Sequence, residues 1–374
     1  YHTMIDPRCF SDCDGRYIGA DKKIHQTKNF TYRTVFSGWD VFRSQFPLQT
    51  LINPRLVNDE INSLIQIAQL SGTEYYPRWE VVNAYSGCML GNPAISVLAD
   101  AYEKGIREYD VQKAVEYAAN TQKQFGNGDL GYTPGSLSHT LEYAYTDWCL
   151  GQLMSSLGKK KEAAEYEKRA KAYRNVWCDS VQWFRARVKG GGWLPWQGRT
   201  AQDQGTTESN PFQQGWFVPH DIDGMKALMG GQKKFDAELE EFFANVPEDF
   251  LWNDYYNHPN EPNHHVPFLF NYSSCPWLTQ KWTRKICDKA YGDDVLGLCG
   301  NEDVGQMSAW YVLAAMGIHP VCPGNPRYEI TSPVFESVEI KLDTHFYSGK
   351  NFKIIARNNS PQNIYIQSVS LNGK

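Results

Sequence analysis

The sequence lacks the features that mark several large classes of protein. No apolar run approaches the roughly 20 residues that a membrane-spanning helix needs. The formal net charge is −5 with no long run of one sign, so nucleic acid is not expected as a partner. A P-loop, a dinucleotide-binding glycine fingerprint and a GxSxG nucleophile elbow are all missing. These absences exclude several enzyme classes and leave a globular chain of unassigned chemistry.

Cysteine is present, but not in a pattern that indicates a metal site. The nine cysteines, from Cys9 to Cys322, are an odd number and include no CxxC pair. A structural zinc site is therefore not expected. Cys9 and Cys13 could form a disulfide, and a fully reduced chain is an equally good interpretation.

Aromatic residues, in contrast, are abundant. The 374 residues suffice for one large domain or two ordinary ones, and 41% of them are hydrophobic. Core packing explains most of the 12 Trp, 22 Tyr and 18 Phe, although sugar-binding surfaces also favour aromatic rings. The chain opens at Tyr1 without a signal peptide and closes on a hairpin-type Asn372-Gly373 pair, so we expect a piece of a longer protein.

Helical periodicity dominates the sequence from residue 54 to about residue 290. Pro54 and Pro93 each begin a helix with an apolar face. Further helices are expected at roughly 110–121, 138–157, 159–176, 233–244 and 276–291. The segment 138–157 is apolar on most sides and should be buried, whereas 159–176 is charged on one face and should be exposed. Such inner and outer helices are what a ring of helical hairpins requires.

After Gly317 the apolar residues alternate with a period of two. We expect strands at 338–342, 352–356 and 364–371, joined by glycine and asparagine turns. The sequence therefore predicts a mainly α-helical domain at 1–320 and, at 321–374, the β-strands of an incomplete β-domain.

Isolated acids stand in three polar loops between the expected helices. Glu302 and Asp303 lie between two glycines ahead of an apolar helix, and Glu208 and Glu261 lie in two other loops. Acids at the start of a helix can be caps and nothing more. Two carboxylates across a pocket are also the minimum for glycoside hydrolysis, in which one protonates the leaving oxygen and the other activates water or attacks carbon. The residues alone leave both interpretations open.

The second loop offers candidate metal ligands. Asn260, Glu261 and the loop of Asp303 carry hard oxygen donors that suit Ca²⁺. His264 and His265 could instead indicate zinc, but they are adjacent rather than one helical turn apart, which disfavours that alternative.

A third candidate cluster lies nearer the start of the chain. Trp39 and Asp40 are followed one helical turn later by Arg43. An acid beside an indole with a nearby guanidinium suits a hydroxyl-rich ligand. An Asp–Arg pair that only fixes the loop is an equally good interpretation.

The loop of Glu302 and Asp303 also carries a family resemblance. Residues Gly300 to Tyr311, with the sequence GNEDVGQMSAWY, resemble the signature of glycoside hydrolase family 92, the calcium-dependent exo-acting α-mannosidases. Further stretches match in the same order: 10–17, 30–44, 140–145, 207–221, 260–265 and 320–324. The resemblance covers essentially the whole chain.

This resemblance implies a fold and an activity. The fold is an (α/α)6 barrel over residues 1 to about 318, preceded by an N-terminal β-sandwich that this chain lacks and that is expected to complete the site. The activity is inverting hydrolysis of terminal α-linked mannose from mannan or N-glycan type oligosaccharides, by a secreted or periplasmic enzyme. The natural partner would be a mannose-containing glycan.

The resemblance also implies roles for individual residues. Glu208 is the general acid, and Asp303 is the general base with Glu302 beside it. The implied metal residues are Asn260 and Glu261, which serve Ca²⁺. The implied substrate-binding residues are Trp39, Asp40, Arg43, His264 and His265.

Three departures from the family pattern lie near the implied site. Phe212 stands where members usually have Trp, Ser209 stands where they usually have Gly, and the segment from Trp79 to Gly91 diverges after Glu80. All three bear on the preferred linkage. Two other functions are considered: a mannan-binding protein without catalysis, and a related (α/α)6-barrel glycosidase that acts on another sugar.

Overall fold

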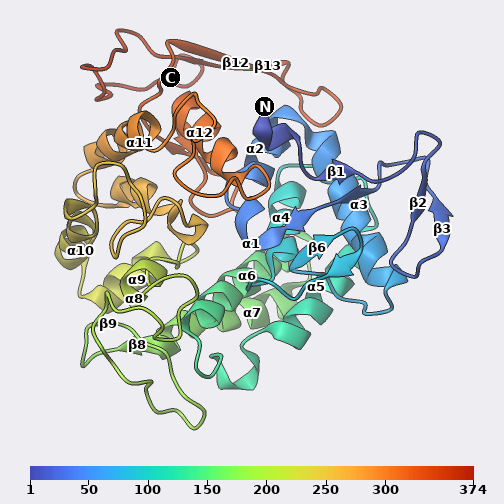
Figure 1. Cartoon of the computed structure of the whole chain (residues 1–374), viewed down its shortest axis with the longest axis horizontal. Coiled ribbons are helices and arrows are strands. Elements are labelled where there is room, and N and C mark those ends of the chain that lie inside the picture. Colours follow the sequence, from blue (N-terminus) through green and yellow to red (C-terminus); the bar gives the residue numbers. More distant parts are fainter.

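Figure 1 shows the computed structural model of the chain, which describes all of residues 1–374. Helices dominate, and they follow one another around a ring, so that α2 near the start lies beside α12 near the end (Figure 1). The first half of the ring holds α1 (Gly38–Val41), α2 (Gln45–Ile52), α3 (Pro54–Leu70), α4 (Pro93–Glu103), α5 (Val111–Phe125), α6 (Leu137–Ser156) and α7 (Lys160–Arg169). The second half holds α8 (Pro211–Gln214), α9 (Ile222–Met229), α10 (Gln232–Ala244), α11 (Trp277–Lys289) and α12 (Gln306–Met316).

Five 3₁₀ helices connect these elements. They are η1 (His2–Met4), η2 (Gly128–Leu130), η3 (Ala170–Val176), η4 (Glu261–Asn263) and η5 (Val266–Tyr272). Two of them, η4 and η5, lie in the loop that carries Glu261. This loop is therefore ordered by its own backbone hydrogen bonds rather than being a loose connection.

The strands form small sheets. The antiparallel pairs are β1 (Arg8–Cys9) with β4 (Arg33–Thr34), β2 (Arg16–Ile18) with β3 (Ile24–Gln26), β8 (Trp177–Cys178) with β9 (Trp183–Phe184), β10 (Ile318–His319) with β11 (Glu329–Ile330), and β12 (Ser337–Lys341) with β13 (Asn351–Ile355). A three-stranded sheet joins β5 (Phe36–Ser37), β6 (Trp79–Val81) and β7 (Ala84–Tyr85).

The predicted inner and outer helices are confirmed. α6 is buried along almost its whole length, and Ser136 begins it by accepting a hydrogen bond from the backbone N–H of His139. α7 packs against α6 but buries only Ala163, so its charged residues face solvent. The alternation follows from the sequence, because α7 has a polar face and α6 has none.

One continuous hydrophobic core of 63 buried residues runs around the ring. A smaller cluster joins Leu48 of α2, Leu313 of α12 and Ile340 of β12, so the β12–β13 hairpin packs on the outside of the point where the ring closes. The predicted strands at 338–342 and 352–356 are confirmed as β12 and β13, with Val338 opposite Ile354. The division into domains at residue 320 stays a prediction.

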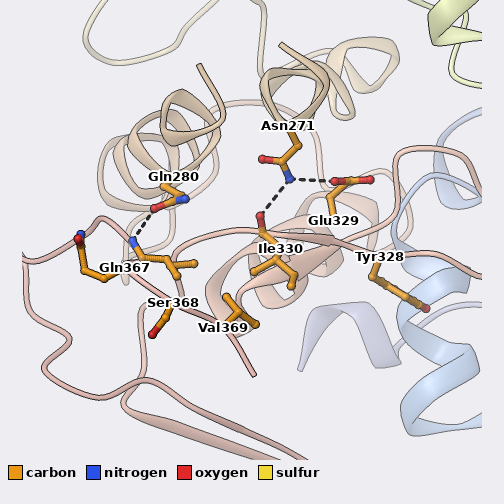
Figure 2. Close-up of a pocket in the computed structure, with 9 residues that line it drawn as sticks. Asn271, Gln280, Tyr328, Glu329, Ile330, Gln367, Ser368 and Val369 are labelled. Carbon is orange, nitrogen blue, oxygen red and sulfur yellow. Dashed lines mark hydrogen bonds between the residues drawn. The ribbon is translucent and has the colours of Figure 1, made fainter. Parts of the chain in front are cut away.

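The strand predicted at 364–371 is wrong. These residues form no ladder, because no neighbouring strand presents its backbone to them and an alternating pattern alone satisfies no N–H or C=O group. Instead the N–H of Ile366 donates to Oε1 of Gln280 at 2.7 Å, beside a pocket whose wall includes Asn271 and Glu329 (Figure 2). None of the predicted site residues lines this pocket.

All nine cysteines are free thiols, so the Cys9–Cys13 disulfide is not formed. None of the helices is both long enough and apolar enough to cross a membrane.

Candidate active site

Three carboxylates from distant parts of the chain lie close together. Asp40 belongs to α1, Glu261 begins η4, and Asp303 lies in the loop before α12. One oxygen of each lies within 4.8 Å of the others, and Asp40 and Glu261 are buried. At such distances in a partly dry environment, three negative charges repel one another strongly.

Burial and the neighbouring charges change the pKa of Asp40. Burial raises the pKa of Asp40 well above its ordinary value, and the charge of Asp303 raises it further. The hydroxyl of Ser37 donates to Oδ2 of Asp40 at 2.5 Å, and this bond works in the opposite direction by favouring the charged form. Ser37 therefore fixes the carboxyl group in the orientation that faces the other two acids.

Glu261 is also buried beside the other two acids, but one of its carboxylate oxygens lacks a hydrogen bond. Burial raises the pKa of Glu261 well above its ordinary value, and the charges of Asp40 and Asp303 add to this effect. Its Oε1 is fully buried and has no hydrogen-bond partner. A buried carboxylate oxygen without a donor is unfavourable, and a cation in the cluster would remove the deficit.

Left-handed backbone shapes the loop of Asp303. Asp303, Val304 and Gly305 have φ of 45°, 60° and 93°. Three successive residues of this kind turn the chain sharply into α12, and they are unusual for the β-branched Val304. The turn brings the carboxyl group of Asp303 back towards Asp40 and Glu261 instead of leaving it at the helix end.

Glu208 lies on a separate loop that faces the cluster. Its backbone is also left-handed, with φ of 52°, and its carbonyl oxygen accepts a hydrogen bond from Nδ2 of Asn260 at 2.8 Å. The residue is exposed overall, but the protein around its carboxyl group displaces part of the water. This partial burial raises the pKa of Glu208, and the charge of Asp303 contributes. A raised pKa favours the protonated form that a general acid requires.

Glu302 points elsewhere. Its Oε1 accepts the backbone N–H of Ser308 at 3.0 Å, its Oε2 accepts the Ser308 hydroxyl at 2.7 Å, and Nδ1 of His2 lies 3.2 Å from Oε2. These bonds satisfy a free N–H in the first turn of α12. Of the two neighbouring acids, Glu302 therefore anchors the helix and Asp303 faces the cluster.

Arg43 pairs with Glu142 of α6 rather than with Asp40. Nη2 of Arg43 donates to Oε1 of Glu142 at 2.9 Å, and the indole N–H of Trp39 donates to the same oxygen at 3.1 Å. All three side chains are buried. The Asp–Arg pair considered from the sequence is thus replaced by a longer-range pair, which fixes Trp39 beside the Asp40 loop. The spacing of Trp39, Asp40 and Arg43 gave no sign of a partner on α6.

The two neighbouring histidines make different contacts. Nε2 of His264 donates to the carbonyl of His258 at 3.0 Å, and its Nδ1 accepts a hydrogen bond from Nε2 of Gln306. Nε2 of His265 donates to the carbonyl of Trp216 at 2.9 Å. Burial lowers the pKa of His264 to about 3 and that of His265 to about 4, so both rings are neutral. With both nitrogens of His264 occupied, a zinc site built on this pair is disfavoured.

The chain matches a known family of enzymes over its whole length. The model of the glycosyl hydrolase family 92 catalytic domain matches residues 1–374. The chain belongs to glycosyl hydrolase family 92. This result agrees with the resemblance found in the sequence and with the mainly helical barrel observed here.

Solved family 92 structures share the fold over the whole chain. An α-mannosidase of this family from Bacteroides thetaiotaomicron covers 100% of the chain with a TM-score of 0.94 and 34% identity, and its complex with mannoimidazole gives 0.93 and 33%. An inverting mannosidase of the same family and organism gives 0.89 and 33%. The match covers 51%, 52% and 55% of these structures' chains, respectively.

The chain also matches a longer fungal protein. A protein of Arthroderma benhamiae described as an uncharacterized secreted glycosidase is 30% identical over an alignment of 334 residues, which covers 76% of this chain and 42% of the relative. The chain therefore spans about half the length, or less, of the proteins that it matches.

The structure locates two of the departures from the family pattern. Phe212 is fully buried, with edge contacts to Trp183 and Phe242 and a tilted contact to Trp216. It packs behind the loop of Glu208 and not in the site. Ser209, in contrast, lies in that loop, and its hydroxyl donates to the carbonyl of Thr207 at 3.0 Å.

Proposed function

We propose that this chain is the catalytic part of an exo-acting α-mannosidase that removes terminal α-linked mannose with inversion, assisted by Ca²⁺. The observation that carries the proposal is the arrangement of four acids: Glu208 on one loop, and a cluster of Asp40, Glu261 and Asp303 facing it. The α-mannosidases and the inverting mannosidase among the related structures support the same sugar and stereochemistry.

Glu208 is proposed as the general acid. Its carboxyl proton passes to the glycosidic oxygen as the bond from that oxygen to C1 of mannose breaks. The raised pKa of Glu208 supports this role, because a carboxyl group that stays protonated at higher pH can still donate. The bond from Asn260 to the carbonyl of Glu208 would hold the loop in position during the transfer.

Asp303 is proposed as the general base. It takes a proton from a water molecule whose oxygen forms the new bond to C1 on the opposite face of the sugar, so the product is β-mannose. An inverting site places its two carboxyl groups roughly 6.5–9.5 Å apart to admit that water. Glu302 supports Asp303 by anchoring the start of α12.

Asp40, Glu261 and Asp303 would hold the cation. Their donor set consists of carboxylate oxygens alone, which suits Ca²⁺, and the unpartnered oxygen of Glu261 fits a ligand role. When bound, Ca²⁺ supplies positive charge and coordination positions for sugar hydroxyls. Asn260 remains a candidate ligand, and Trp39, Arg43, His264 and His265 are proposed to shape the pocket around the mannose.

The substrate would be mannan or an N-glycan type oligosaccharide. The protein would be secreted or periplasmic, and the description of the fungal relative as secreted supports this location. A β-sandwich from the remainder of the longer protein is proposed to complete the site.

Proton NMR of the released sugar tests the proposal. We expect β-mannose as the first product from a panel of α-linked mannobioses. Release of the α anomer would refute inversion. Release of glucose but not mannose from aryl glycosides would indicate another glycosidase, and a protein that only binds mannan would release no sugar.

A further inference from the structure

Gln306, the first residue of α12, lies behind the three acids and contacts the segments that carry them. It is fully buried, and its side-chain amide makes four hydrogen bonds. An amide has two donor hydrogens and two acceptor sites, so every one of them is used. A buried amide with no unused capacity has one favourable orientation, and it holds its partners firmly.

The acceptor side of the amide holds the segment of Asp40. Oε1 of Gln306 accepts the backbone N–H groups of Ser44 and Gln45 at 2.9 and 3.0 Å. These N–H groups belong to the start of α2, where no residue of the helix itself can serve as acceptor and the side chain of Ser44 makes no capping bond. Gln306 therefore caps α2, although it lies near the other end of the chain. The capped residue Ser44 follows Asp40 by four residues.

The donor side holds the segment of Glu261. Nε2 of Gln306 donates to Nδ1 of His264 at 3.0 Å and to the hydroxyl of Ser44 at 2.9 Å. The indole N–H of Trp310, one turn along α12, donates to the carbonyl of His264 at 2.8 Å. His264 follows Glu261 by three residues, so the loop of Glu261 is tied to α12 at two points.

The third acid is held by the same set of hydrogen bonds around Gln306, which is called the strap below. Asp303 precedes Gln306 by three residues, and the N–H of Gln306 donates to the carbonyl of Asp303 at 3.2 Å. We infer that Gln306 is the positioning residue that assembles Asp40, Glu261 and Asp303 into one cation-binding cluster. The geometry of this strap is independent of the reaction, whereas its consequence for cation affinity rests on the proposed function.

Substitution of Gln306 by Met tests the inference. Methionine keeps the length and removes all four hydrogen bonds, which frees the three loops to move apart under the repulsion of their acids. Residues that orient metal ligands typically change metal affinity 10- to 100-fold when replaced. Calorimetric titration of the chelator-treated protein with CaCl₂ should therefore show the Kd of Gln306→Met raised about 10- to 100-fold over the wild type.

Gln122→Met is the matched control. Gln122 lies on α5, is also buried, and its amide bonds to Asn92, Tyr143 and Thr146. Its loss should lower the unfolding temperature to a similar extent and leave the Ca²⁺ Kd unchanged. An equal rise of Kd in both variants would mean that Gln306 acts only through general stability, and the inference would be wrong.

A second measurement works without calcium. The N–H groups of Ser44 and Gln45 are buried and bonded to Gln306, so their hydrogen–deuterium exchange reports the strap directly. Gln306→Met should speed exchange at residues 44–45 and 258–265, and Gln122→Met should not. Gln306→Glu keeps an acceptor oxygen, so faster exchange should be confined to 258–265.

These measurements separate the two hypotheses. If the wild type binds no Ca²⁺ but exchange changes as expected, the proposed cofactor is wrong and the strap is confirmed. If the wild type and Gln306→Met bind Ca²⁺ equally, with unchanged exchange, the strap is wrong and the calcium site stands. Should Gln306→Met fail to fold, the exchange pattern of Gln306→Glu decides.

Discussion

Glu60 is a buried acid in α3 whose titration should control how stability depends on pH. Only 1% of its surface is exposed, and its Oε2 has no hydrogen-bond partner. Burial raises the pKa of Glu60 from about 4.5 to about 8, and the charge of Glu80 contributes, although Arg33 acts in the opposite direction. Above that pH the folded protein must hold an additional charge in its interior.

The size of the effect follows from this shift. The folded protein keeps the proton of Glu60 up to about pH 8, whereas the unfolded chain releases it near pH 4.5. The contribution is therefore fully present below about pH 4 and is lost as the pH rises through 8. At about 1.4 kcal/mol per pKa unit, the difference amounts to nearly 5 kcal/mol at most. For a chain of this length, an unfolding entropy of about 0.8 kcal/mol/K converts this into about 6 °C.

The assay compares the wild type with Glu60→Gln, which keeps the shape and cannot ionise. Unfolding temperatures are measured by calorimetry from pH 5 to pH 9. The variant should be close to the wild type at pH 5 and up to about 6 °C more stable at pH 9. The exposed Glu162→Gln on α7 is the control and should track the wild type throughout. A Glu60→Gln difference that stays constant across the range would refute the reasoning.

Three further predictions concern the site. Glu208→Gln should abolish turnover of mannosides with poor leaving groups and spare activated aryl mannosides, as measured by kcat on both substrate types; an equal loss on both would contradict the acid assignment. CaCl₂ at about 100 times its Kd should raise the unfolding temperature by about 3 °C. Chelation should remove activity that CaCl₂ restores, and indifference to the chelator would contradict the metal assignment. Arg43→Met should destabilise the protein by about 3–5 kcal/mol, because it leaves Glu142 buried without its partner, and Arg43→Met/Glu142→Gln should recover most of the loss in urea unfolding. Failure of the double variant to recover would locate the loss in packing.

The sequence predicted the helices well because their cause is local. Pro54, Pro93 and the cap at Ser136 begin helices through their own backbone preferences, and the buried and exposed faces of α6 and α7 follow from side-chain polarity alone. The strand at 364–371 failed for the opposite reason. Pairing depends on a partner elsewhere in the chain, and an alternating pattern contains no information about it.

The site was predicted unevenly for the same reason. The loops of Glu208, Glu261 and Asp303 were found from motifs, and their residue roles stay predictions. Asp40 was predicted to bind the substrate, and that role stays a prediction; its place in the acid cluster was not predicted. Glu142 and Gln306 lie inside stretches that match the family, but nothing local to them identifies their partners Arg43 and Ser44, which lie 99 and 262 positions away along the chain.

The closure of the ring by α2 and α12 has a consequence for synthesis. Asp40 leaves the ribosome 263 residues before Asp303. At about 5–20 residues per second, some 13–50 s pass before α12 can supply the amide that caps α2. During that interval α2 lacks its cap, and Asp303 is not yet present beside Asp40 and Glu261. The full repulsion within the cluster therefore arises only when most of the core is available to oppose it, and a nascent chain that stops before the loop of Asp303 would lack both the third acid and the amide of Gln306.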